Sequence, residues 1–129
     1  MEMKLAQRAA VWLPPFALMA VIFALSAQPH LSSGLGLADL VGRKVVHFLE
    51  YALLAFLWWR ALRTRVPGQY AVMAGFAMAS LYAASDEWHQ SFVEGRHATP
   101  VDWAIDTAGA GVAAWQLARR RRPQRRIAS

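Results

Sequence analysis

The sequence predicts an all-α integral membrane protein, a single-domain bundle of four spanning helices with both termini in the cytoplasm. The 129 residues suffice for one domain, and 57% are apolar while 17% are charged, against about 25% charged in ordinary soluble domains. Four apolar stretches follow one another at residues 9–27, 45–62, 70–87 and 101–118. Their lengths approach the roughly 20 residues that cross a bilayer as a helix.

The distribution of charge predicts the orientation of this bundle. Eleven of the fourteen Lys and Arg residues lie on the side of the two termini: Lys4, Arg8, Arg60, Arg63, Arg65, Arg119, Arg120, Arg121, Arg122, Arg125 and Arg126. Seven of the eight acidic residues lie on the other side. Because basic loops are retained in the cytoplasm, we expect a cytoplasmic basic tail at 119–129 and an acidic side that faces outward.

The first stretch contains Pro14-Pro15, which removes two backbone donors and is expected to kink the helix or delay its start. An alternative for this stretch is a cleaved signal peptide, since Leu25-Ser26-Ala27 resembles a weak cleavage site. Between the second and third stretches, Pro67-Gly68 predicts a turn.

The third stretch has small residues at every fourth position, namely Ala71, Gly75, Ala79 and Ala83, so one face of its helix is nearly flat. Flat faces let helix backbones approach closely in lipid. The fourth stretch carries a similar set around Gly109. We therefore expect close contact between the third and fourth helices, and these faces also offer a surface for a homo-oligomer.

Composition also excludes some classes of function. The chain contains no cysteine, which excludes a disulfide scaffold and a cysteine metal site. A basic tail is typical of nucleic-acid binding too, but no soluble domain accompanies it here. An anchor in contact with anionic membrane lipid is the preferred interpretation, with no nucleic-acid partner.

Polar residues gather at the outward ends of the predicted spans. Lys44, His47, Phe48 and Tyr51 are spaced so that they share one helix face, and Asp102 and Asp106 share another. The third stretch ends on Asp86, Glu87 and Gln90. Charged groups at membrane depth cost about 2.5–3.5 kcal/mol each or more, so they must pair, be protonated, bind a cation or line a wet cavity.

These residues resemble the motifs of a known family. Lys44-x-x-His47-Phe48-x-x-Tyr51 is similar to the first motif of the VanZ-like membrane proteins, Asp86-Glu87-x-x-Gln90-x-Phe92-x-x-Gly95-Arg96 to the second, and Asp102, Asp106 and Gly109 to the third. Asp106 departs from the family pattern, in which Asn is common at this position. The resemblance implies a small multi-pass protein of the bacterial inner membrane and a link to tolerance of teicoplanin, a glycopeptide antibiotic with an acyl tail.

The residues and the resemblance together leave three functions open. The preferred one is binding of an amphiphilic envelope ligand, either a lipid-linked cell-wall precursor or an acylated glycopeptide, at the outward face. The expected ligand-binding residues are Lys44, His47, Tyr51, Asp86, Glu87, Gln90, Arg96, Asp102 and Asp106. The second is an intramembrane enzyme acting on a lipid-linked phosphate or glycan. Its catalytic candidates are Asp86, Glu87, Asp102 and His47. No cofactor is expected, except that these carboxylates could hold a divalent cation. The third is a scaffold held by a salt-bridge network.

Overall fold

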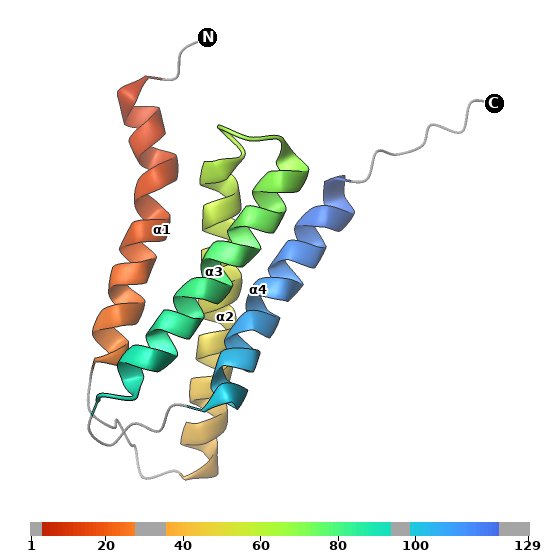
Figure 1. Ribbon diagram of the computed structural model, residues 1–129. Helices are drawn as coiled ribbons and strands as arrows, with labels where there is room; N and C mark the ends of the chain where they lie inside the picture. Colours follow the sequence, from red (N-terminus) through yellow and green to blue (C-terminus); the bar gives the residue numbers. More distant parts are fainter. Residues whose placement is uncertain (1–3, 28–35, 94–98, 122–129) are drawn as a thin grey trace, which may run out of the picture.

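The computed structural model describes residues 4–27, 36–93 and 99–121, and these residues form four helices (Figure 1). The helices are α1 (Leu5–Ser26), α2 (Leu37–Leu62), α3 (Gly68–Gln90) and α4 (Pro100–Arg121). No strand occurs within the described ranges. The prediction of an all-α fold with four helices is therefore confirmed.

The four helices run alternately up and down, so α2 and α4 are parallel to each other (Figure 1). Helices α2, α3 and α4 each pack against the other two, and α2 makes its most extensive contacts with α4. Helix α1 contacts α2 and, less extensively, α3, and no contact between α1 and α4 occurs in the part of the chain that is described. Helix α1 is thus the most loosely held element of the bundle.

The helices extend beyond the apolar stretches that predicted them. Helix α2 begins at Leu37, well before the expected residue 45, because polar residues at its start still complete the backbone hydrogen bonds of a helix. Helix α1 begins at Leu5 and continues through Pro14 and Pro15, so the expectation of a delayed start is wrong. The carbonyl of Ala10, which has no N–H partner at Pro14, instead accepts a hydrogen bond from Arg60 Nη2 of α2 at 2.6 Å.

Small residues let α2 approach its two neighbours at backbone distance. A Cβ atom added at Gly75 of α3 would lie 2.9 Å from the carbonyl oxygen of Ala55 in α2. A Cβ atom added at Gly109 of α4 would lie 2.2 Å from the carbonyl oxygen of Phe48, also in α2. Helices α3 and α4 do pack together, but the tightest approaches of both glycines are to α2 rather than to each other.

The core is correspondingly thin and lies along α2. It is formed by Tyr51, Leu54, Ala55 and Trp58 of α2 with Ile22, Ala79, Ala83 and Ala110 from the other helices. Alanine from α3 and α4 meets larger side chains from α2 and α1, which keeps the interior filled while the backbones are close. The flat face of α3 is therefore buried inside a single copy of the chain.

Much of the outer surface is apolar. Helices α1 and α2 are both long and apolar enough to cross a membrane, and only 17% and 28% of their apolar windows are buried inside the bundle. Large side chains such as Leu13, Phe16 and Phe23 of α1 are about half exposed or more. Contiguous apolar surface of this kind marks contact with lipid or with another protein.

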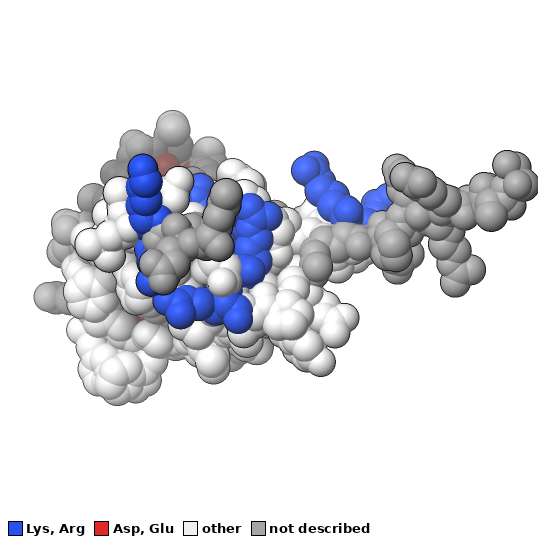
Figure 2. Space-filling view, turned by 90° about the horizontal axis from the view of Figure 1, so that it is seen from above, with Lys and Arg blue, Asp and Glu red and all other residues white. Residues whose placement is uncertain are grey.

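The two ends of the bundle differ in charge, as the sequence predicts. The start of α1, the turn between α2 and α3, and the end of α4 lie at one end, here called the basic end (Figure 1). Seen from above, Lys and Arg side chains surround this end, and very little acidic surface is visible there (Figure 2). The opposite end, here called the polar end, carries the described Asp and Glu residues, all of which belong to residues 39–106.

Candidate ligand-binding site

The first and third sequence motifs face each other across the parallel pair α2 and α4. Lys44 Nζ of α2 donates to Asp102 Oδ1 of α4 at 2.9 Å. One turn further along, His47 Nδ1 lies 3.6 Å from Asp106 Oδ1. The register is regular because both helices rise in the same direction from the polar end, so residues spaced by about one turn on α2 meet residues spaced by one turn on α4.

A second network connects α1, α2 and α3 around a buried carboxylate. Asp86 of α3 is 3% exposed, and its Oδ2 accepts hydrogen bonds from Tyr51 of α2 at 3.1 Å and from Gln90 Nε2 at 3.4 Å. Gln90 Nε2 also donates to Ser26 Oγ at the end of α1, at 3.2 Å. These hydrogen bonds hold the polar ends of three helices in one arrangement.

Two further carboxylates at the polar end are buried with few hydrogen-bond donors around them. Asp106 is 1% exposed, and neither of its oxygens accepts a hydrogen bond from any described residue. Glu87 is also buried, and its Oε2 likewise has no hydrogen-bond partner among the residues described. The charges of Asp86, Glu87 and Asp106 are close enough to interact. Burying such groups is costly unless a proton, a cation or a donor completes them.

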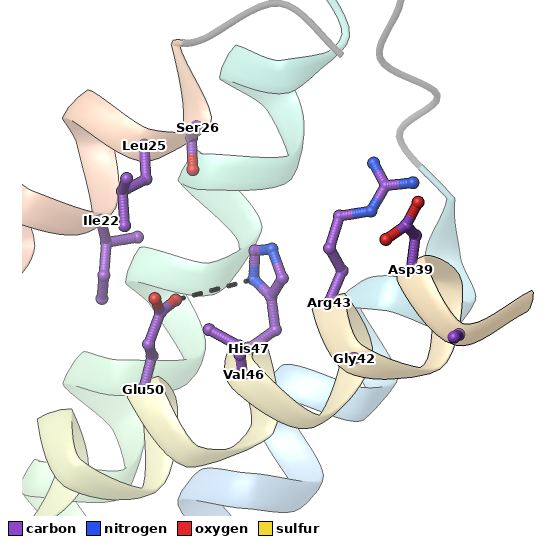
Figure 3. Close-up of a pocket in the computed structure, with 10 residues that line it drawn as sticks. Ile22, Leu25, Ser26, Asp39, Gly42, Arg43, Val46, His47 and Glu50 are labelled. Carbon is purple, nitrogen blue, oxygen red and sulfur yellow. Dashed lines mark ion pairs between the residues drawn. The ribbon is translucent and has the colours of Figure 1, made fainter. Parts of the chain in front are cut away.

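A cavity of about 380 Å³ opens beside this network, between the end of α1 and the start of α2 (Figure 3). Its lining residues are Ile22, Leu25 and Ser26 of α1 and Ala38, Asp39, Gly42, Arg43, Val46, His47 and Glu50 of α2. The two walls differ in character. The α1 wall is largely apolar, whereas four ionisable side chains rise from α2 to the same side (Figure 3).

His47 links the cavity to the buried acids. Its Nδ1 lies 4.0 Å from Glu50 Oε2, within the cavity (Figure 3), and 3.6 Å from Asp106 Oδ1 of α4, which is not part of the lining. The imidazole therefore stands between two carboxylates from different helices. An imidazole beside carboxylates is an arrangement found in many acid–base sites.

The structure brings together most of the residues that the sequence singled out. Lys44, His47, Tyr51, Asp86, Glu87, Gln90, Asp102 and Asp106 all lie at the polar end. Of these, His47 lines the cavity, Lys44 and Asp102 form the ion pair, and Tyr51, Asp86 and Gln90 form the hydrogen-bond network. Glu87 and Asp106 are the two further buried carboxylates. Arg96 lies outside the described residues. Among the described side chains, no group of three His, Asp or Glu residues is arranged to hold a metal ion.

Sequence reasoning missed the rest of the α2 wall. Asp39, Arg43 and Glu50 line the cavity, yet none was selected as a ligand-binding residue. The signal was available, because positions 39, 43, 47 and 50 recur at helical spacing and share one face. The predicted span began at residue 45 and so excluded Asp39 and Arg43, whereas Glu50 lies inside that span but belongs to none of the three motifs.

Fold and site together define the class of protein: an all-α bundle with an apolar exterior, a basic end, and a polar end that contains an amphipathic cavity. Residues 2–119 match the model of the VanZ/LLP1 family, so the chain belongs to that family. No curated protein and no solved structure shows significant similarity to the chain.

Proposed function

We propose that the protein is a multi-pass protein of the bacterial inner membrane, with both termini cytoplasmic and the polar end facing outward. The exposed apolar surfaces of α1 and α2 support a lipid environment. The basic end supports the orientation, since Lys and Arg are enriched on the cytoplasmic side of membrane proteins. Helices α3 and α4 would complete the four spans within the same bundle.

In this orientation, we propose that the protein binds an amphiphilic envelope ligand, either a lipid-linked cell-wall precursor or an acylated glycopeptide. The observation that carries the proposal is the cavity with two unlike walls. An apolar chain would lie along Ile22 and Leu25 of α1, while a polar head group would meet Arg43 and His47 of α2. Arg is suited to two-point contact with phosphate or carboxylate.

The surrounding residues have supporting roles in this proposal. The Lys44–Asp102 ion pair ties α2 to α4, the Tyr51–Asp86 hydrogen bond ties α2 to α3, and the Gln90–Ser26 hydrogen bond ties α3 to α1. Helix α1 makes fewer contacts with the rest of the bundle than the other three helices make with one another. An apolar chain would therefore enter between α1 and α2 from the lipid without disturbing the α2, α3 and α4 core.

The thermal unfolding of detergent-purified protein against a panel of ligands tests the proposal. The panel holds polyprenyl phosphates, lipid-linked cell-wall precursors, an acylated glycopeptide, plain anionic lipids and divalent ions. A ligand present at about 100 times its dissociation constant stabilises the folded protein by about 2.7 kcal/mol. We expect such a shift in Tm with one class of envelope amphiphile.

A cavity-filling variant makes the test specific to this site. Gly42 lines the cavity, and a Cβ added there meets nothing within 4 Å, so Gly42→Leu fills the space without a clash. Gly42→Leu should fold normally and lose the ligand-dependent shift. Ala84→Leu, on an exposed position of α3, is the matched control and should keep it. Equal shifts in both variants, or no shift with any amphiphile, would contradict the proposal.

A second function is favoured by the position of His47 between Glu50 and Asp106. An intramembrane enzyme acting on a lipid-linked phosphate or glycan would use His47 to transfer a proton within the cavity. Turnover of such a substrate by the purified protein, lost in His47→Gln with folding intact, is the expected result for an enzyme. Ligand binding without turnover would leave binding as the function.

A further inference from the structure

The α2 wall of the cavity also indicates the chemistry of the head group, an inference that rests on the proposed function. We propose that the ligand is an amphiphile whose head group carries a primary ammonium beside a phosphate or carboxylate, with Glu50 binding the ammonium and Arg43 the anion. The α1 wall then holds the first part of its apolar chain.

Glu50 is the first observation that carries this assignment. Its side chain lines the cavity and is only 18% exposed, so the carboxylate is largely removed from water. Its contact with the ring of His47, at 4.0 Å from Nδ1, is too long for a hydrogen bond. A carboxylate enclosed in this way gains most from a ligand that brings both positive charge and N–H donors.

The charge behind Glu50 strengthens the preference for a cation. Asp106 is 1% exposed, shares His47 with Glu50, and accepts no hydrogen bond from the described residues. Lys44 does not neutralise this region, because its ammonium lies 2.9 Å from Asp102. Asp106 is therefore a second buried carboxylate behind this part of the cavity wall, and a ligand with an ammonium group brings the cation and the N–H donors that such carboxylates favour.

Arg43 supplies the complementary charge at the right distance. Glu50 is seven positions after Arg43, which places the two residues two turns apart and about 10 Å along the helix axis. Their side chains rise to the same side of α2, on either side of His47 (Figure 3). Asp39, the other acid of the cavity, lies on the far side of Arg43 from Glu50. The space between Arg43 and Glu50 suits a head group whose two charges are a few bonds apart.

A graded series of lipids with identical acyl chains tests the inference. The series runs from phosphatidylethanolamine through its N-methyl and N,N-dimethyl derivatives to phosphatidylcholine, with phosphatidylglycerol as the anionic lipid and phosphoethanolamine as the chain-free head group. Affinity is measured by native mass spectrometry of the detergent-purified full chain. Methylation keeps the charge and removes N–H donors one at a time.

We expect phosphatidylethanolamine to bind about tenfold more tightly than phosphatidylcholine, with a stepwise loss along the methyl series, because charge-assisted hydrogen bonds are removed. Phosphoethanolamine should bind more weakly than the lipid, since it cannot use the apolar wall. Glu50→Gln should abolish the preference for the primary ammonium. Arg65→Gln changes one charge at the opposite, basic end of the bundle, far from the cavity, and it should leave the preference unchanged.

Three results would overturn the inference. Equal affinity for phosphatidylethanolamine and phosphatidylcholine, or tighter binding of phosphatidylglycerol, would show that no ammonium site exists. A preference that survives Glu50→Gln would show that another residue holds the ammonium. After any of these results, the proposed function would still be supported if a different amphiphile binds and Gly42→Leu abolishes that binding. If none of the amphiphiles tested binds, both the inference and the proposed function are contradicted.

Discussion

At the scale of the residue, buried carboxylates and close glycines decide how the polar end is built. Asp86 Oδ2 accepts hydrogen bonds from Tyr51 and Gln90 on two helices, whereas Asp106 has His47 beside it and no hydrogen bond from the described residues. The spacing of the motifs predicted that these residues share helix faces. It did not predict which faces meet, because that depends on the close approach of α2 to both neighbours.

Gly109 is the residue on which the α2–α4 approach depends most. In Gly109→Ala the added Cβ would lie 2.2 Å from the carbonyl oxygen of Phe48, so the two helices must separate. We expect a loss of about 1–3 kcal/mol, as is typical of overpacked interiors, seen as a lower Tm in detergent. Gly111→Ala is the control, because its Cβ would meet only a ring carbon of Phe76 at 3.6 Å. Equal effects of the two substitutions would disprove the close approach.

Tyr51 tests the network around Asp86. Tyr51→Phe removes the hydroxyl that donates to Asp86 Oδ2 at 3.1 Å and leaves a buried carboxylate with one donor fewer. The expected cost is about 1–3 kcal/mol, again measured as a fall in Tm. Tyr70→Phe is the matched control, since Tyr70 is 55% exposed, and it should have no effect. An unchanged Tm in Tyr51→Phe would show that the hydroxyl is not needed.

At the scale of the element, local sequence predicted the existence and order of the helices but not their ends. Apolar composition marks the parts of a helix that face lipid or core, so the polar first turns of α2 were left out, and with them Asp39 and Arg43. The small-residue face of α3 was correctly identified as a packing face. The predicted contact of α3 with α4 is confirmed, but Gly75 itself lies against the backbone of α2, which the sequence did not predict.

Helix α1 shows how a proline pair is accommodated without breaking a helix. Pro14 leaves the carbonyl of Ala10 without its usual donor, and Arg60 of α2 supplies one at 2.6 Å. Arg60→Met should therefore lower Tm, and it should cost less in a Pro14→Ala background, where the backbone N–H of residue 14 takes over. Arg65→Met, exposed in the α2–α3 turn, is the control for loss of charge. The same cost of Arg60→Met in both backgrounds would show that Arg60 acts by another contact.

At the scale of the whole molecule, the separation of charge along the chain becomes a separation between two ends of the bundle. An up-and-down topology places residues 4–8, 60–65 and 119–120 together at one end and the described residues of the three motifs at the other (Figures 1 and 2). The number and order of the spans in the sequence are enough to predict this separation of charge. The cavity could not be predicted in the same way, because its shape depends on the distance between the end of α1 and the start of α2.

The most direct test asks whether the cavity opens to the outside of the cell. The chain contains no cysteine, so a single one can be placed in the cavity by Gly42→Cys or at the basic end by Gln69→Cys. A membrane-impermeant maleimide is applied to bacterial cells whose outer barrier is permeable to it. We predict labelling of Gly42→Cys in intact cells, slowed by the ligand that raises Tm, and labelling of Gln69→Cys only after lysis. Labelling of Gln69→Cys in intact cells, with Gly42→Cys protected until lysis, would contradict an outward-facing binding site.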